Sequence, residues 1–322
     1  MMDAAGNRHF PTPFHPHEMA AQERIGVRGQ MEKVGKLVLR DYMPEQHREF
    51  FALLPTFFVG GSDARGDVWA SVCWGDAGFV TSPHPTLLRI GAHLQADDPL
   101  ALSVREGAPL GGLGLQFETR RRNRANGVVS AVDAQGFTFA VQQSFGNCAK
   151  YIQTRTLLAP PPAVQAVPAL RGDGRLPAAA KALIRHCDTF FIATSVANTE
   201  TSAAYGADVS HRGGRPGFVH VDAQDVLTWP DFQGNHFFNT VGNLLADARA
   251  GLLFIDFEQG HLLHLSGRAE VVWEGPQVEG FAGAKRLLRF APERHVFRQG
   301  ALPLRWTPCE SSPHLAATGV WD

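Results

Sequence analysis

Four short motifs occur twice in this chain, in the same order, and this repetition constrains the fold more than any other feature. They are Thr56-Phe-Phe-Val59 with Thr189-Phe-Phe-Ile192, Gly78-Phe-Val80 with Gly217-Phe-Val219, Ala96-Asp97 with Ala246-Asp247, and Asn126-Gly-Val-Val129 with Ser266-Gly-Arg-Ala269. Their separations lie between 133 and 150 residues, so the order is kept while loop lengths differ. The pattern predicts a duplicated domain, each copy built from antiparallel strands with one helix before its last two strands.

Length and composition agree with two packed domains. At about 150 residues per domain, 322 residues correspond to about two. The formal charge of −1 argues against a general binder of nucleic acid or of anionic membranes. No apolar run approaches the ~20 residues of a membrane span, and no signal peptide is readable. We therefore expect a cytoplasmic protein whose four cysteines are reduced thiols.

Composition shifts divide the chain into four parts. We expect an N-terminal arm with short helices over residues 1–45, a first domain over 46–157, and a second domain with a C-terminal extension over 177–322. Residues 158–176 contain three consecutive prolines, which predicts an extended linker. Helices are expected over 31–40, from Pro44 onward, and over 177–185.

The second copy carries the clearest local pattern. It predicts strands over residues 218–221, 226–229, 251–257 and 262–273. A helix is expected over 236–246, with Asn235 as its N-cap. Strands surrounding one short helix indicate a small closed barrel. The last part of the chain, after about residue 273, has no clear pattern.

Several segments resemble one known family. The second copy contains GADVSHRGG at residues 206–214 and LTWPDFQGN at 227–235, and NTVGNLLAD follows at 239–247. The first copy contains RRNRANG at 121–127 and SFGNCAKYI at 144–152, with Ala149 where the family has proline. Over about 220 of the 322 residues the chain resembles the pyridoxamine 5'-phosphate oxidase-like FMN-binding split-barrel family. The resemblance implies an α+β fold, mainly antiparallel β, with two tandem split β-barrels, short helices and an N-terminal helical arm.

The resemblance also implies a flavin site, because an FMN phosphate needs N–H and hydroxyl donors. At the turn before the helix the family commonly has Ser with Arg or Lys, where this chain has Asn235 and His236. The candidate cofactor-binding residues from the second copy are Ser210, His211, Arg212, Gly213, Trp229, Asp231, Asn235, His236, Asn239 and Asn243, and those from the first copy are Arg122 and Arg124.

Several of these residues have structural interpretations as well. The glycines after Arg212 can form a plain turn, and the arginines at 120–122 and 124 can form a solvated strand edge. Cys148 beside Lys150 can be a reactive thiol near a base, although buried packing of the thiol is the favoured interpretation. The histidine pairs bring no carboxylate or thiol at metal-ligand spacing, so no metal is expected.

The function predicted is that of an FMN-dependent oxidoreductase acting on an unidentified small molecule. No dinucleotide fingerprint is present, so electrons would come from a transiently bound nucleotide or an external donor. The alternatives are a non-catalytic binder of haem or flavin and an electron-transfer module working with a separate reductase. A homodimer is expected, because a half-exposed flavin needs a second surface. One FMN per chain is expected, because Pro83 and Pro85 lack N–H donors where the second copy has its turn.

Overall fold

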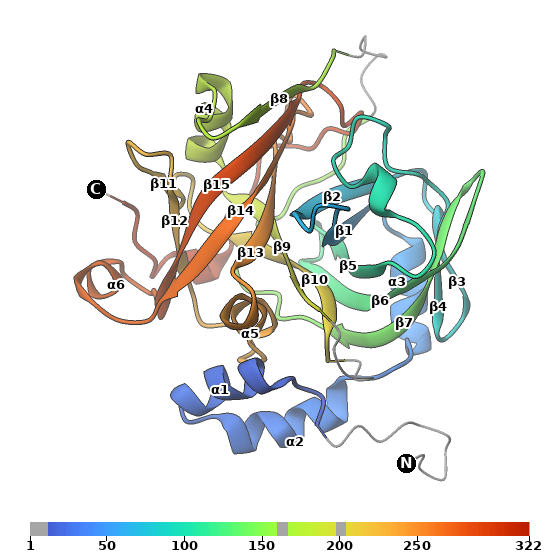
Figure 1. The fold of residues 1–322 in the computed structure, drawn as a ribbon, viewed down its shortest axis with the longest axis horizontal. Coiled ribbons are helices and arrows are strands. Elements are labelled where there is room, and N and C mark those ends of the chain that lie inside the picture. The colour runs from blue at the N-terminus through green and yellow to red at the C-terminus, as the bar shows by residue number, and fades with distance from the viewer. Residues whose placement is uncertain (1–11, 160–166, 198–203, 322) are drawn as a thin grey trace.

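The computed structural model describes residues 12–159, 167–197 and 204–321. It is mainly antiparallel β-structure in two sheets, which lie side by side in Figure 1. The first sheet has the strand order β2-β1-β5-β6-β7-β4-β3 and the second β10-β9-β13-β14-β15-β12-β11. The bounds of the first sheet are β1 Thr56–Ser62, β2 Val68–Trp74, β3 Val80–His84, β4 Leu87–Ile90, β5 Pro109–Gln116, β6 Arg121–Asp133 and β7 Gly136–Gly146.

The second sheet and the helices complete the fold. The strands are β9 Thr189–Val196, β10 Gly206–Gly213, β11 His220–Val221, β12 Leu227–Asp231, β13 Arg249–Ile255, β14 Leu262–Val272 and β15 Arg286–Arg298, with β8 Leu170–Asp173 paired to β15. The helices are α1 Pro16–Arg24, α2 Arg28–Val38, α3 Glu45–Ala52, α4 Ala178–His186, α5 Asn239–Ala246 and α6 Pro276–Gly280. No helix in the described ranges combines the length and the apolar character needed to cross a membrane.

The two sheets correspond strand by strand. Adding eight to each strand number of the first sheet reproduces the order of the second. Both sheets also carry an irregularity at the same point, because β6 shifts register between Asn126 and Gly127 and β14 between Ser266 and Gly267. A bulge changes the twist and re-aims neighbouring side chains, so a shared bulge indicates a shared design.

The sheets pack against each other through matching residues. Phe58 of β1 stacks on Phe191 of β9, with ring centroids 3.6 Å apart. A Cβ at Gly111 would lie 2.7 Å from the backbone of Asp208, and a Cβ at Gly251 would lie 2.5 Å from the backbone of Trp69. These contacts are reciprocal, because β5 approaches β10 as β13 approaches β2. Glycine is required at both positions for the backbones to come this close.

Apolar strand residues form three buried groups, which account for the packing within and between the two sheets. One lies within the first sheet and includes Phe57 and Phe139, and one within the second includes Phe190 and Trp229. A third lies between the sheets and includes Leu113 and Leu253. The central strands are therefore buried on both faces, which is why they read as continuous apolar runs rather than as alternating patterns.

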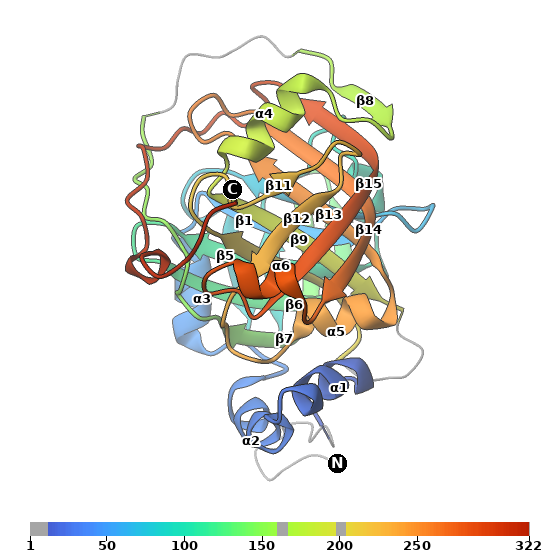
Figure 2. The same ribbon diagram turned by 90° about the vertical axis from the view of Figure 1, so that its left-hand side faces the viewer.

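The N-terminal arm and the linker frame the sheets at opposite ends. Figures 1 and 2 both place α1 and α2 beneath α5, whereas α4 and β8 lie at the other end. The helices expected over 31–40, from Pro44 and over 177–185 are confirmed as α2, α3 and α4. Residues 160–166 of the expected linker lie outside the described residues, and the rest of that segment contains β8.

Three expectations about local structure are wrong. The first sheet has no helix between β4 and β5, where only the 3₁₀ turn Ala101–Ser103 forms. Asn235 is not the N-cap of α5, because the helix begins three residues later than expected and its N-cap is Phe238. Pro83 and Pro85 lie in and just after β3, before β4, whereas the turn of the second copy follows β12. The prolines therefore do not correspond to that turn.

Candidate functional site

A small cavity of about 90 Å³ lies between the two sheets at the start of α5. Its walls come from β6 of the first sheet and from β10, β12, β15 and the first turn of α5. A water molecule takes about 30 Å³ in the liquid, so the cavity has the size of a small polyatomic ion. It is too small for a whole cofactor, because ligand pockets for drug-sized molecules measure about 300–1,000 Å³.

Positive charge dominates this cavity. Four arginines line it: Arg122 and Arg124 from β6, Arg212 from β10 and Arg286 from β15, whereas Asp231 is its one acidic residue among the described lining residues. A second carboxylate, Asp208, forms an ion pair with Arg124 behind the wall. Because uncompensated buried charge is costly, this excess of guanidinium groups favours an anion in the cavity.

Two of the arginines are held in place by backbone and side-chain acceptors. Arg124 donates from Nη1 to Asn239 Oδ1 at 3.0 Å and from Nη2 to Ser210 Oγ at 2.5 Å. Arg122 donates from Nε to the carbonyl oxygen of Cys148 at 2.8 Å and from Nη1 to that of His211 at 3.3 Å. The guanidinium groups are thus fixed before any ligand arrives, which lowers the entropic cost of binding.

Other donors at the cavity lack acceptors. The Nε atoms of Arg124, Arg212 and Arg286 and the Nη1 atom of Arg286 are buried without a hydrogen-bond partner in the described part of the chain. Asp231 lies near two of them, with its oxygens 3.9 Å from Arg212 Nε and 3.3 Å from Arg286 Nε. Buried donors are satisfied in the great majority of native proteins, so these atoms point to an acceptor supplied by a ligand.

The electrostatics agree with this interpretation. Burial, together with the charges of Arg212 and Arg124, lowers the pKa of Arg122 to about 9. Burial also lowers the pKa values of Arg124 and Arg286, and in each case the charge of Arg212 lowers the pKa further. The charge of Arg212 therefore disfavours the charged forms of Arg122, Arg124 and Arg286, and an anion between these groups would relieve that repulsion.

The start of α5 contributes backbone donors. The chain reaches the helix through two left-handed residues, His236 with φ 62° and Phe238 with φ 63°. Asn235 Oδ1 accepts from the N–H of Phe237 at 3.2 Å, so its side chain closes the turn rather than capping the helix. No side chain caps α5, and Asn239, Thr240 and Val241 of its first turn line the cavity. Uncapped N–H groups at a helix start favour an anion.

The structure brings together eight of the twelve residues suggested by the sequence. Those that line the cavity are Arg122, Arg124, Ser210, Arg212, Asp231, Asn235, His236 and Asn239. Side chains alternate between the faces of a strand. His211 accordingly lies on the opposite face of β10 from Ser210 and Arg212, against the ring of Phe191.

The other three residues lie elsewhere as well. Trp229 is in the core of the second sheet. A Cβ on Gly213 would lie 1.9 Å from the carbonyl oxygen of Tyr151, so the glycine allows a neighbouring segment to pass. Asn243 faces the N-terminal arm, where His15 Nε2 lies 3.0 Å from its Oδ1.

Sequence reasoning missed Arg286. It lies on β15 opposite Asp231 of β12, in the part of the chain that showed no clear pattern. Its guanidinium carbon lies 4.7 Å from the ring centroid of Phe238 and 5.0 Å from that of Trp273, and these rings hold it toward the cavity. The available signal was a charged residue directly before the apolar pair Leu287–Leu288, which marks a strand start.

The N-terminal arm is attached to the same site through α5. Asn239 donates from Nδ2 to Glu18 Oε1 at 2.6 Å, while its own Oδ1 accepts from Arg124. A Cβ on Gly242 would lie 2.5 Å from Glu18 Cγ, so α1 and α5 are in close contact. Burial raises the pKa of Glu18 to about 8. Asn239 therefore connects a buried carboxyl group of the arm to an arginine of the cavity.

Comparisons with solved structures found proteins of low identity. HupZ of Group A Streptococcus has 16% identity and a TM-score of 0.31, covering 40% of this chain and 98% of that chain. HutZ, the heme storage protein from Vibrio cholerae, has 16% identity and a TM-score of 0.27, covering 39% and 95%. The FAD-binding protein from Mycobacterium smegmatis has 16% identity and a TM-score of 0.25, covering 38% and 97%. At these values the likeness carries no functional argument.

One part of the chain matches a family model. No curated protein matches the sequence. Strands β9 to β15, α4 and α5 lie within the stretch that a family model covers. Residues 176–300 match the model of the pyridoxamine 5'-phosphate oxidase family.

Proposed function

We propose that this chain is an FMN-binding flavoprotein whose flavin phosphate occupies the cavity at the start of α5. The observation that carries the proposal is the convergence of four guanidinium groups, with unpaired N–H donors, on a cavity of about 90 Å³. A phosphate monoester fits this donor set, because it has three acceptor oxygens and close to two negative charges. The isoalloxazine ring lies outside the cavity in this proposal, because the volume holds only the phosphate.

The residues divide into two roles in this proposal. Arg212 and Arg286, like Arg124, have unpaired Nε donors in the described part of the chain, and these two bind the phosphate directly in this proposal, with the N–H groups of the first turn of α5. Arg122 and Arg124 are already held by protein acceptors and supply positive potential from the first sheet. When bound, FMN supplies the redox chemistry, and the protein binds and orients it. We propose oxidoreduction of a small molecule with electrons from an external donor.

We further propose that the two sheets are tandem copies of one split barrel. The identical strand order, the shared bulge and the reciprocal contacts of Gly111 and Gly251 support this duplication. The family match over residues 176–300 supports the relationship for the second copy. In this proposal both walls of the site come from one chain, because Arg124 belongs to the first copy and Arg212 to the second.

The proposal is tested by flavin titration. The purified chain should bind FMN with quenching of flavin fluorescence and a rise in the thermal unfolding midpoint, at one FMN per chain. Riboflavin, which lacks only the phosphate, should bind at least about tenfold more weakly, because each charge-assisted hydrogen bond contributes about 1.5–3 kcal/mol. No response to FMN in either measurement would refute the proposal. Equal affinities for FMN and riboflavin would refute the role of the cavity.

Haem binding is the second candidate, and one residue favours it. His236 lines the cavity and is half-buried, so its imidazole is accessible as an iron ligand. The absorption spectrum distinguishes the two, since haem gives a strong Soret band that flavin lacks. If haem is the ligand, His236→Ala should remove the Soret band of the reconstituted protein.

The assembly and compartment stay proposals. We propose a homodimer in the cytoplasm, consistent with four cysteines that are all free thiols. The candidate cavity itself needs no second chain, because one chain supplies all its walls. Light scattering of the FMN-loaded protein checks the dimer, and a 35 kDa species would contradict it.

A further inference from the structure

The first sheet contains a counterpart of the anion cavity. Val59 of β1 pairs with Ser71 of β2, and the matching Ile192 of β9 pairs with Ser210 of β10. Ser71 is therefore the counterpart of Ser210. His264 lies two residues before the bulge position Ser266 of β14, as Arg124 lies two residues before Asn126 of β6.

A carboxylate occupies this counterpart. Ser71 Oγ donates to Asp98 Oδ2 at 2.5 Å, and Arg298 Nη1 donates to the same oxygen at 3.1 Å. The N–H of Leu100 donates to Asp98 Oδ1 at 2.9 Å, and His264 Nε2 lies 3.8 Å from Oδ2. Asp98 is only 4% exposed, so these groups replace water around both of its oxygens. The hydroxyl, the guanidinium and the backbone N–H around it are donors of the kind that bind oxyanions, and the imidazole of His264 packs beside them.

Asp98 lies beside Ser71 because the connection after β4 differs from the matching connection after β12. It lies between β4 and β5, whereas the matching connection between β12 and β13 forms α5. In the second sheet the hydroxyl of Thr240 on α5 faces the serine, with its Oγ1 3.2 Å from Ser210 Oγ. In the first sheet the carboxylate of Asp98 faces the serine instead. Both serines donate to a carboxylate, Ser210 to Asp208 of its own strand at 3.2 Å and Ser71 to Asp98. Only Asp98 comes from the connecting loop, and it fills the place that the Thr240 hydroxyl has in the other site.

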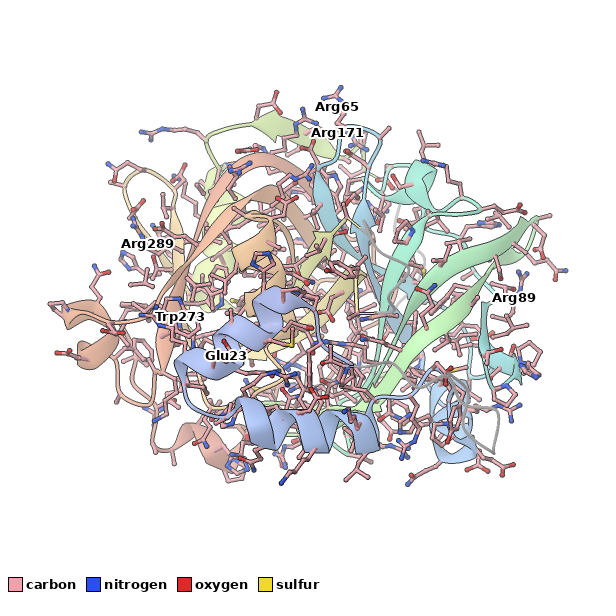
Figure 3. All side chains as sticks on the ribbon, turned by 60° about the horizontal axis from the view of Figure 1, so that its bottom comes forward. Glu23, Arg65, Arg89, Arg171, Trp273 and Arg289 are labelled. Atoms are coloured by element: carbon pink, nitrogen blue, oxygen red, sulfur yellow. The ribbon has the colours of Figure 1, made fainter. Side chains whose placement is uncertain are left out.

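Asp98 also lies at the wall of a larger opening. A cleft of about 730 Å³ is lined by Asp98, Arg65, Arg171 and residues of β15. Figure 3 shows Arg65 and Arg171 beside each other at one edge of the molecule. Removal of the Asp98 side chain would therefore open its donor set to ions that enter from the cleft.

We propose that Asp98 is the built-in occupant of a second anion site, which takes a small oxyanion such as formate or phosphate once this side chain is removed. In the intact chain the carboxylate accepts from Ser71, Arg298 and the N–H of Leu100 and prevents anion binding there. The inference concerns the groups around Asp98, which come from both sheets, and does not depend on which cofactor the other cavity holds.

The test is chemical rescue of Asp98→Ala. The substitution leaves Arg298 with Asp97 as its remaining carboxylate partner and removes the buried acceptor of Ser71, Arg298 and the N–H of Leu100. The thermal midpoint should therefore fall by about 5–10 °C. Sodium formate or sodium phosphate should then raise the midpoint of the variant by at least about 3 °C more than that of the unchanged protein. Sodium chloride at equal ionic strength should produce no such difference.

Asp98→Asn is the matched control, because its amide fills the same space and carries no charge. It should be destabilised and not rescued, since no room is left for an anion. The unchanged protein, Asp98→Ala and Asp98→Asn all retain Arg212 and Arg286, so anion binding at the other cavity shifts all three alike. Rescue of both variants to the same extent, or of neither, would overturn the proposal.

If Asp98→Ala folds too poorly for thermal unfolding, a refolding assay tests the proposal instead. In that case the yield of soluble protein after refolding from urea is compared with and without formate. A yield increased at least about threefold by formate, for Asp98→Ala and not for Asp98→Asn, is the expected result. Yields that formate does not change would overturn the proposal.

Discussion

Ser210 and Ser71 occupy matching positions in the two sheets, yet they face opposite arrangements of charge. Around Ser210 four arginines converge on a cavity, and several of their N–H groups are unpaired within the described residues. Around Ser71 the buried guanidinium of Arg298 is bonded to Asp98 and Asp97. The same strand framework thus supports one region suited to binding and one that is internally neutralised. The difference arises in strand residues, since Arg212 of β10 corresponds to Cys73 of β2 and Arg124 of β6 to His264 of β14, and in the loops after β4 and β12.

The largest expected effect concerns stability and separates the two regions. Arg298→Ala should lower the free energy of unfolding by about 3–5 kcal/mol, because it leaves the buried Asp98 without its partner. Both side chains are only 1% exposed. Arg212→Ala should cost about 1 kcal/mol or less, since it removes one of several mutually repelling charges. Urea unfolding followed by tryptophan fluorescence measures both, and equal losses would mean that the two regions do not differ in this way.

The next effect concerns FMN binding, and here substitutions in the cavity at α5 should have the larger effect. Arg212→Ala and Arg286→Ala should each weaken FMN binding by about 10–150-fold, the equivalent of about 1.5–3 kcal/mol. Arg89→Ala serves as the control, because Arg89 pairs with Asp133 on the surface. Figure 3 places Arg89 at the edge of the molecule far from Trp273, which contacts Arg286. Fluorescence titration gives the dissociation constants, and a loss for Arg89→Ala as large as for Arg212→Ala would contradict the assignment.

The smallest effect concerns pH and compares His264 with its counterpart Arg124. Burial lowers the pKa of His264 below its ordinary value of 6.5. As the pH falls through about 6.5, the unfolded chain takes up a proton there that the folded chain refuses, so stability decreases. His264→Asn has no such titrating group and lacks this loss. Between about pH 7.5 and about pH 5.5, the free energy of unfolding should therefore fall less for the variant than for the unchanged protein. Arg124→Gln should show no such shift, and a pH-independent difference for His264→Asn would contradict the prediction.

Much of the fold could be predicted because it rests on local patterns. The repeated Thr-Phe-Phe motifs mark β1 and β9, which lie at matching places in the two sheets. Proline at a helix start located α3 and α4. β15 was not predicted, because it mixes charged and apolar residues over thirteen positions and follows a bulged partner. Pairing with β14 and β12 determines its conformation, and such long-range contacts leave little local signal.

The candidate site could be predicted only in part, for a related reason. Motif residues on one strand or turn, such as Ser210 and Arg212, line the cavity as the sequence suggested. Arg286 joins them through strand pairing, and Asp98 reaches Ser71 through a loop without periodicity. Pro83 and Pro85 do not correspond to the turn after β12, because strand order, and not similar composition, determines which segments of the two sheets match. Strand pairing and loop paths determine which of these residues become neighbours, and neither leaves a local signal in the sequence.

The contact between α1 and α5 has a consequence for the order of synthesis. Glu18 is made 221 residues before its partner Asn239, and His15 is made 228 residues before Asn243. At about 5–20 residues per second, the arm waits on the order of 10–45 s for the helix on which it packs. During that interval the first sheet can form, and the arm can make only its contacts with that sheet, such as the bond from Gln143 Nε2 to the carbonyl oxygen of Pro13. α1 thus leaves the ribosome well before α5, yet its contacts with α5 can form only after that helix has been made.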